Sequence, residues 1–177
     1  MIEKIEIPLS KKKIALLFIG AIVFVIFGIL FVLTPETFKS SIFRNPETIR
    51  IAGIASLLFF GLCTVFIAKK LFDNKVGLTI DQDGITDNSS ATSVGLIEWK
   101  DIKGIETLQI VSTRILMLRT DQPDKYIDRA KNGISKRAMK ANLKMYGSPL
   151  SIISNSLKIK FVDLERLILS EFEKRKK

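Results

Sequence analysis

The chain contains no histidine and a single cysteine, Cys63. Without histidine there can be no histidine-based catalytic triad, no histidine zinc site and no imidazole proton shuttle near neutral pH. One cysteine cannot form a disulfide within the chain or a cysteine metal cluster. The sequence also has no glycine-rich phosphate loop, no serine nucleophile elbow and no kinase-type set of lysine and carboxylates. These absences argue against an enzyme, and we expect no cofactor and no metal site.

Charged residues are missing from two long apolar runs, Ile14–Leu33 and Ile51–Ala68. A helix of about 20 residues, rising about 1.5 Å per residue, crosses the roughly 30 Å hydrocarbon core of a bilayer. The first run is too long for the core of a signal peptide and lacks a small-x-small cleavage site after it. A helix start at Asn45-Pro46-Glu47 extends the second span toward its N-terminus. The sequence therefore predicts two membrane spans, at about 14–33 and 46–70.

Lysines flank the two predicted spans. Lys11, Lys12 and Lys13 precede the first span, whereas Lys69, Lys70 and Lys75 follow the second. Because lysine and arginine next to a span favour its cytoplasmic end, both outer ends of the pair are expected in the cytoplasm. The sequence thus predicts a multi-pass hairpin with cytoplasmic N and C termini.

The remaining sequence divides into an N-terminal segment with the hairpin, residues 1–75, and a cytosolic domain, residues 76–177. Alternation around Ile5 and Ile7 predicts a short strand before Pro8. Within the domain we expect five strands, a helical insertion at about 123–147, a closing hairpin and a C-terminal capping helix that begins at Asp163. The insertion holds one helix from Pro123 to Asn132-Gly133 and a second at about Ser135–Tyr146. The predicted strands are Gly77–Asp81, Ile85–Asn88, Gly95–Trp99, Gly104–Ser112 and Ile115–Thr120, with Ser151–Ile153 and Leu157–Phe161 as the closing hairpin.

Two acidic groupings in the sequence are candidates for a site. The run that starts at Asp81-Gln82-Asp83-Gly84 lacks the glycine and glutamate positions of a calcium loop, so a hairpin turn is favoured. Glu98 and Asp101 flank Trp99, as an acid–base pair could. On a strand, however, neighbouring side chains face opposite ways, and we expect Trp99 in the core with Glu98 in solvent.

A basic helix is the strongest candidate for a binding site. The formal net charge of the chain is +10, and the segment Arg129–Gly147 contains six basic residues and no acidic one. Lys136, Lys140 and Lys144 recur every four residues, with Arg137 beside them. The expected apolar stripe of this helix consists of Ile134, Ala138, Ala141 and Met145, widened by Met139, Leu143 and Tyr146.

This helix has two interpretations. Its apolar stripe could pack on the domain and leave a solvated cationic face, or the cations could face anionic lipid headgroups. Nucleic acid is disfavoured because Tyr146 is the only aromatic residue in the segment. We therefore take Lys136, Arg137, Lys140 and Lys144 as candidates for contact with lipid or an acidic partner.

The segment Gly95-Leu96-Ile97-Glu98-Trp99-Lys100-Asp101-Ile102, followed by Gly104-Ile105, resembles the signature of bacterial pleckstrin-homology-like domains. The whole chain resembles a family of small two-helix bacterial membrane proteins of unknown function. That resemblance implies a pleckstrin-homology-like, seven-strand barrel or sandwich and a location in the cell (inner) membrane. Pleckstrin-homology folds elsewhere often bind phosphoinositides through a basic loop between their first strands. Here that loop, Gln82-Asp83-Gly84, is short and acidic, so phosphoinositide binding is not carried over. The segments that carry the whole-chain resemblance are Glu6–Lys13, Asp87–Ser90 with Val94–Ile97, and Lys144–Pro149.

The fold class expected from these observations is α+β. The expected function is a membrane-anchored, non-enzymatic binding or scaffolding module at the cytosolic face of a bacterial membrane. Its expected partners are membrane lipids and an unidentified membrane or cytosolic protein, with no nucleic acid, and the oligomeric state is left open. An immunity or self-protection protein against a membrane-directed toxin is the alternative, suggested by size and topology.

Overall fold

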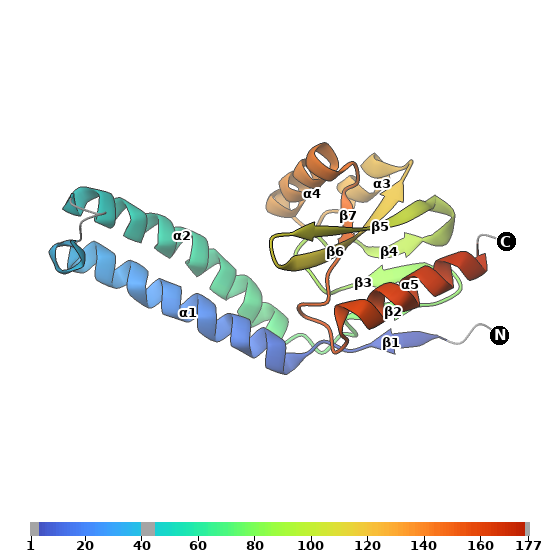
Figure 1. The fold of residues 1–177 in the computed structure, drawn as a ribbon, viewed down its shortest axis with the longest axis horizontal. Helices are drawn as coiled ribbons and strands as arrows, with labels where there is room; N and C mark the ends of the chain where they lie inside the picture. Colours follow the sequence, from blue (N-terminus) through green and yellow to red (C-terminus); the bar gives the residue numbers. More distant parts are fainter. Residues whose placement is uncertain (1–3, 40–44, 176–177) are drawn as a thin grey trace. The chain divides into compact units, whose positions relative to one another are not determined.

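The computed structural model describes residues 4–39 and 45–175 and shows an α+β protein (Figure 1). Two compact units can be distinguished. One unit is Lys11–Asp73, and the other combines Met1–Ser10 with Asn74–Lys177. The expected boundary near residue 75 is therefore incomplete, because the residues that precede the first long helix belong to the C-terminal domain.

The first unit is a helical hairpin. Its helices are α1 (Lys11–Leu33) and α2 (Pro46–Leu71), with the short 3-10 helix η1 (Pro35–Phe38) after α1. Both helices are long and apolar enough to cross a membrane. The side chain of Asn45 accepts a hydrogen bond from Glu47 N and caps α2, so the helix start expected there is confirmed.

Close packing joins the two long helices. A Cβ atom on Gly53 would lie 2.8 Å from Phe31 Cβ and 2.9 Å from Gly28 O, so only glycine fits at this crossing. The rings of Phe24 and Phe60 stack with their centroids 4.3 Å apart. Most other apolar side chains of α1 and α2 point outward and are exposed, as hydrocarbon-facing residues would be.

The second unit contains two antiparallel sheets and three helices. Of the two forms expected, a seven-strand barrel or sandwich, no closed barrel forms within the residues that the structure describes; the strands form separate sheets of four and three. The first sheet has the order β1 (Ile5–Ile7), β2 (Leu78–Ile80), β3 (Gly84–Asp87) and β4 (Gly95–Glu98). The second has the order β5 (Ile102–Ile110), β6 (Thr113–Thr120) and β7 (Leu150–Ile152).

The pairing of β1 with β2 brings together two ends of the sequence that the helical hairpin separates. Ile5 pairs with Ile80 and Ile7 with Leu78. The following residues continue the contact, because Ser10 N donates to Ser156 O at 2.8 Å and Lys158 N donates to Pro8 O at 2.9 Å. In the sequence, the α1–α2 hairpin is thus an insertion between two strands of the domain that pair with each other.

This pairing also explains why the expected closing hairpin is wrong in its second half. Leu157 forms only an isolated bridge with Leu9, and Phe161 already begins α5 (Phe161–Arg175). Residues 156–158 therefore pair with residues 8–10 and not with β7. The alternation of Leu157, Ile159 and Phe161 does not mark a second strand of the hairpin. Asp163 consequently lies in the first turn of α5 and does not precede it.

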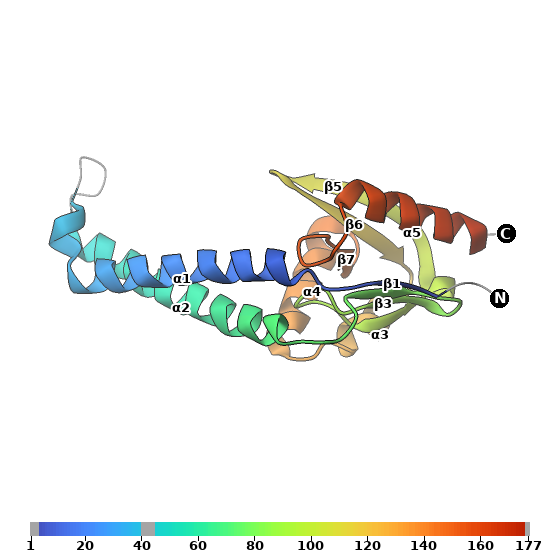
Figure 2. The ribbon, with the colours of Figure 1, turned by 90° about the horizontal axis from the view of Figure 1, so that it is seen from below.

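Three further helical segments complete the domain: η2 (Trp99–Asp101), α3 (Pro123–Asp128) and α4 (Gly133–Tyr146). The helical insertion expected at 123–147 is confirmed as α3 and α4, but α3 ends at Asp128, and Asn132 caps the start of α4 instead of ending the first helix. Both views place this pair on the side of the domain away from α5 (Figures 1 and 2). The α5 helix contacts both sheets, since Arg175 donates to Asp81 O after β2 and Thr107 of β5 donates to Glu165.

The core of the domain is apolar and includes the only tryptophan. Trp99 is 9% exposed, which confirms that it is buried, and its Nε1 donates to Asp81 O at 2.9 Å. The sequence predicted that Trp99 would be the last residue of a strand. In the structure β4 ends at Glu98, and Trp99 begins η2. The largest side chains with almost no exposed surface include Leu78, Ile85, Leu116, Leu118, Tyr126, Met139 and Ile152.

Candidate functional site: the exposed face of α4

Both ends of α4 are fixed to the domain. At its start, Asn132 accepts a hydrogen bond from Ser135 N, and Ser135 Oγ donates to Ala91 O at 2.7 Å. At its end, Gly147 has a φ of 75°, a left-handed conformation that terminates the helix as expected. Arg119 donates to the carbonyl of Tyr146. The helix therefore presents a defined face to its surroundings.

The face of α4 that packs on the domain differs from the apolar stripe that the sequence predicted. Met139 is fully buried and Ser135 nearly so, whereas Ile134 is 70% and Met145 61% exposed. Ser135 and Met139 are one turn apart and point into the domain. Ile134 and Met145 lie about a third of a turn from them on the helical wheel, so α4 is rotated relative to the sequence interpretation.

The four candidate cations lie on the outer side of this rotated helix. Arg137, Lys140 and Lys144 are exposed, and Lys136 is half-buried. Lys136 Nζ forms an ion pair with Asp128 at 2.8 Å, and it holds the pKa of that carboxyl below its usual value. Among the described residues, Arg137, Lys140 and Lys144 have no carboxylate within ion-pair distance. Three cations are thus free to meet an external anion.

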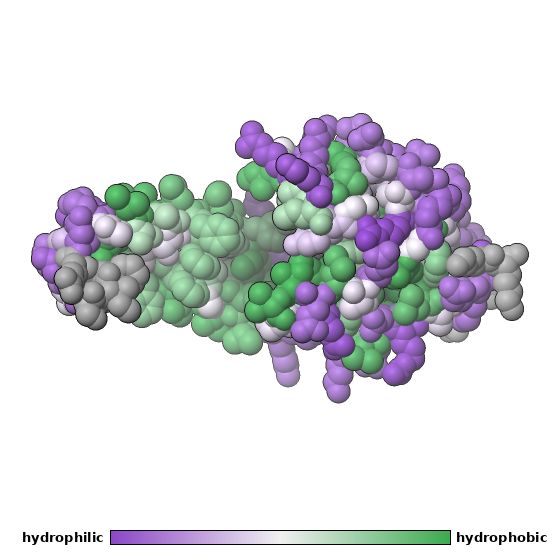
Figure 3. Space-filling model, turned by 45° about the horizontal axis from the view of Figure 1, so that its top comes forward, coloured by the Kyte–Doolittle hydropathy of each residue, from purple (hydrophilic) through white to green (hydrophobic). Residues whose placement is uncertain are grey.

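The exposed face of α4 therefore combines three available cations with two exposed apolar side chains. Lys140, Lys144 and Arg137 adjoin Ile134 and Met145 on consecutive sectors of the helix. Helices that lie in a membrane interface have this combination: apolar side chains enter the headgroup region and cations contact lipid phosphates. Figure 3 shows hydrophobic side chains on the domain as separate patches within a mostly hydrophilic face.

A second polar cluster, which sequence reasoning missed, connects α3 to the corner between β4 and β5. Lys125 Nζ lies 2.6 Å from both Glu98 Oε1 and Asp101 Oδ2, and Tyr126 Oη donates to Asp101 Oδ2 at 2.7 Å. Arg129 Nη2 lies 3.4 Å from Glu98. The sequence predicted that Glu98 would be a freely solvated side chain. Instead, its carboxylate accepts from several cations.

The pKa values in this cluster reflect its charge pairing. Hydrogen bonds from Lys100 and Lys125 lower the pKa of Glu98 to about 2. Burial opposes ionisation of Asp101, but hydrogen bonds from Lys125 and Tyr126 outweigh it and lower the pKa of this carboxyl. Burial and the hydrogen bond to Asp101 raise the pKa of Tyr126 to about 12. Each carboxylate thus accepts from at least two donors, and the cluster fixes α3, and through it α4, on the sheet.

No local signal in the sequence marks this cluster. Glu98 and Lys125 are 27 residues apart, and the spacing between Asp101 and Tyr126 is 25 residues.

Among residues 4–39 and 45–175, no group of three or more histidine, cysteine, aspartate or glutamate side chains could hold a metal ion. Comparisons of the chain with protein-family models, curated proteins and solved structures gave no match.

Proposed function

We propose that this protein is a membrane-anchored, non-enzymatic binding module at the cytosolic face of a bacterial inner membrane, and that α4 binds anionic lipid headgroups. The observation that carries the proposal is the exposed face of α4. There, three cations without a carboxylate partner among the described residues adjoin exposed Ile134 and Met145. Exposed apolar side chains beside unpaired cations are the combination by which a helix binds an anionic membrane interface.

The domain architecture supports a two-pass topology with both termini in the cytoplasm. Because β1 pairs with β2, the segments before α1 and after α2 belong to one folded domain. If both helices cross the bilayer, a single domain can receive their outer ends only on one side. Lys11, Lys12, Lys13, Lys69 and Lys70 at these ends favour the cytoplasmic side.

Two antiparallel sheets and the C-terminal helix α5 are compatible with a pleckstrin-homology-like domain. The Gly95–Ile102 segment that suggested this family forms β4, η2 and the start of β5. We therefore propose that relationship for the domain. The expected lipid contact lies on α4 and not at the Gln82-Asp83-Gly84 turn.

The energetics of the proposed contact are sufficient for an anchored domain. Each lysine or arginine near an anionic leaflet contributes about 1 kcal/mol, so Arg137, Lys140 and Lys144 together contribute about 3 kcal/mol. Burial of Ile134 and Met145 in the interface adds a hydrophobic contribution of similar size, about 1.5–3 kcal/mol for each fully buried side chain. The covalent anchor keeps the domain at a high local concentration near the membrane, so this modest sum is enough to orient it.

A fluorescent probe on α4 tests the proposal with the full chain. In a Cys63→Ser background, Ile134→Cys carries an environment-sensitive dye, and the protein is reconstituted in zwitterionic or anionic lipid nanodiscs. We expect blue-shifted emission only with anionic lipid, and we expect added salt to reverse it. Equal emission in both lipids would refute the contact.

Charge-matched variants separate the α4 face from the net charge of the domain. The triple substitution Arg137→Gln, Lys140→Gln and Lys144→Gln should abolish the blue shift. The control triple, Lys4→Gln, Arg166→Gln and Lys174→Gln, removes the same charge from exposed residues elsewhere. An equal loss of the shift in the control would show that net charge, and not α4, is responsible.

A further inference from the structure

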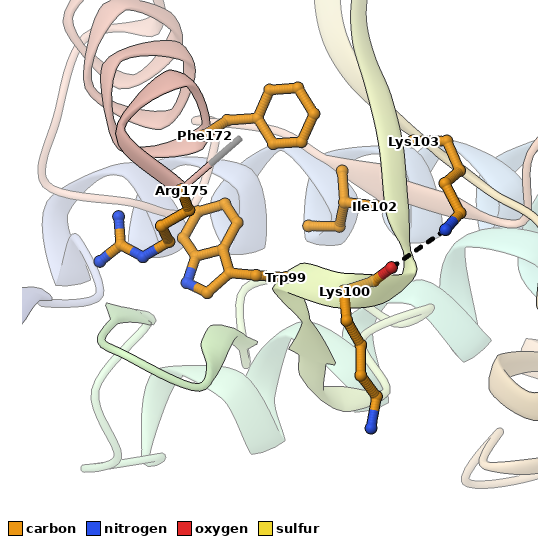
Figure 4. Close-up of a pocket in the computed structure, with 6 residues that line it drawn as sticks. All are labelled: Trp99, Lys100, Ile102, Lys103, Phe172 and Arg175. Atoms are coloured by element: carbon orange, nitrogen blue, oxygen red, sulfur yellow. Dashed lines mark hydrogen bonds between the residues drawn. The ribbon is translucent and has the colours of Figure 1, made fainter. Parts of the chain in front are cut away.

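A pocket of about 390 Å³ lies between α5 and the corner where η2 meets β5. The pocket is separate from α4, and it shares one residue with the polar cluster, because Lys100 also forms an ion pair with Glu98. Figure 4 shows the side chains of Trp99, Ile102 and Phe172 around a common space on one side of β5, whereas Lys103 lies across the strand with its ammonium directed to Lys100 O. The residues that line it are Trp99, Lys100, Ile102, Lys103, Phe172 and Arg175.

The apolar wall of the pocket is already ordered. Trp99, Ile102 and Phe172 are all buried residues of the domain. The indole of Trp99 is held by its hydrogen bond to Asp81 O and by the Arg175 guanidinium, which lies 4.6 Å from the ring centroid. Arg175 is itself fixed by Glu171 at 2.6 Å. A hydrophobic ligand would therefore meet preorganised surfaces and lose little binding energy to their ordering.

The charge of the pocket has one sign. Among the described lining residues three are cationic and none is acidic. Arg175 is committed to Glu171, and the Lys100 side chain extends away from the space (Figure 4). Lys103 is different: its ammonium lies 3.2 Å from Lys100 O and forms a half-exposed ion pair with Asp121, also at 3.2 Å. Exposed pairs of this kind are weak, so Lys103 can exchange Asp121 for a ligand carboxylate.

We propose that this pocket binds a small organic monocarboxylate with an aromatic or branched hydrophobic body. The body would pack against Trp99, Ile102 and Phe172, and the carboxylate would accept a hydrogen bond from Lys103 Nζ. This binding site goes beyond the lipid contact of α4, since it uses none of the same residues. It gives the anchored domain a soluble ligand in addition to a membrane surface.

The single tryptophan of the chain provides a direct test. The full chain in zwitterionic nanodiscs is titrated with phenylbutyrate, and the indole N–H resonance of Trp99 is followed by NMR. We expect a saturable shift with phenylbutyrate and about fivefold weaker binding of the neutral phenylbutyramide, which has the same body. Absence of a saturable shift, or equal affinities for the acid and the amide, would overturn the proposal.

Variants test the assignment of the two parts of the ligand. Lys103→Gln should weaken phenylbutyrate binding about threefold to fivefold and leave phenylbutyramide unaffected. Phe172→Leu should weaken both ligands, and Lys131→Gln, an exposed cation outside the pocket, should change neither. An unchanged affinity in Lys103→Gln would refute the carboxylate site. Anionic nanodiscs without phenylbutyrate could themselves shift the Trp99 indole resonance and then prevent phenylbutyrate from binding. That result would identify a lipid headgroup as the occupant of the pocket and refute a soluble ligand.

Discussion

Gly77 N donates a hydrogen bond of 3.0 Å to Ile7 O, although both long apolar helices lie between these two residues in the sequence. The contact lies beside the register in which Ile7 pairs with Leu78. It closes the four-stranded sheet with a strand that is synthesised before the hairpin. The domain therefore needs residues from both sides of the hairpin.

This closure predicts that residues 1–10 are required for a stable domain. A soluble chain in which residues 1–10 are joined to residues 74–177 by a short Gly-Ser linker should unfold cooperatively. Residues 74–177 alone should be less stable by about 3–6 kcal/mol, because burial of Ile7 and Leu9 is lost at about 1.5–3 kcal/mol each. Thermal unfolding followed by circular dichroism measures the difference. Equal midpoints for the two chains would contradict this role of β1.

The orientation of α4 predicts effects of different size for its two methionines. Met139→Ala should reduce the free energy of unfolding by about 2–5 kcal/mol, because Met139 is fully buried. Met145→Ala should change it by less than about 0.5 kcal/mol, because Met145 is exposed. Denaturation of the full chain in detergent, monitored by Trp99 fluorescence, tests both. A larger effect at Met145 would restore the stripe expected from the sequence.

The polar cluster predicts a loss of stability in acid. Pairing with Lys100 and Lys125 lowers the pKa of Glu98 from 4.5 to about 2 in the folded protein. The folded state therefore keeps Glu98 ionised where the unfolded state binds a proton, so stability falls as the pH drops from about 4.5 toward 2. Glu98→Gln should show a shallower decrease across this window. Denaturant midpoints measured by Trp99 fluorescence at each pH give the slopes, and equal slopes would remove Glu98 from the explanation.

The helix crossing predicts a position-specific effect of added methyl groups in the hairpin. Gly53→Ala should loosen the pair, because its Cβ would lie 2.8 Å from Phe31 Cβ. Gly61→Ala is the matched control, since its Cβ would meet no atom within 4 Å. Hydrogen–deuterium exchange of α1 and α2 in nanodiscs should be faster for Gly53→Ala only. Similar exchange in the two variants would show that this contact does not limit helix separation.

Local signals account for the parts of the fold that could be predicted. Asn45 and Gly147 marked helix ends because capping depends on a few adjacent residues. The strands around Leu78 and Ile97 and the burial of Trp99 followed from alternation. The false strand at Leu157–Phe161 shows the limit of that signal. Buried alternating residues indicate contact with a core, but they do not identify the partner.

The candidate site was only partly predictable for the same reason. The four cations of α4 were found from their spacing, but the side of the helix that packs on the domain was not. Ser135 is buried because its hydroxyl reaches Ala91 O, a contact across 44 residues. That contact turns Met139 inward and leaves Ile134 exposed. The Glu98–Lys125 cluster and the Trp99 pocket likewise join distant segments, which no short motif marks.

The sequence by itself determined two charge-free apolar runs, their lysine flanks and most of the strands and helices that follow, because these depend on composition and on neighbouring residues. Only the tertiary structure decided that Ile5–Ile7 completes a sheet with residues beyond the hairpin. It also decided which face of α4 is exposed and which aromatic residues form a pocket. Those outcomes depend on packing between segments far apart in the chain, where the choice of partner is set by the whole fold.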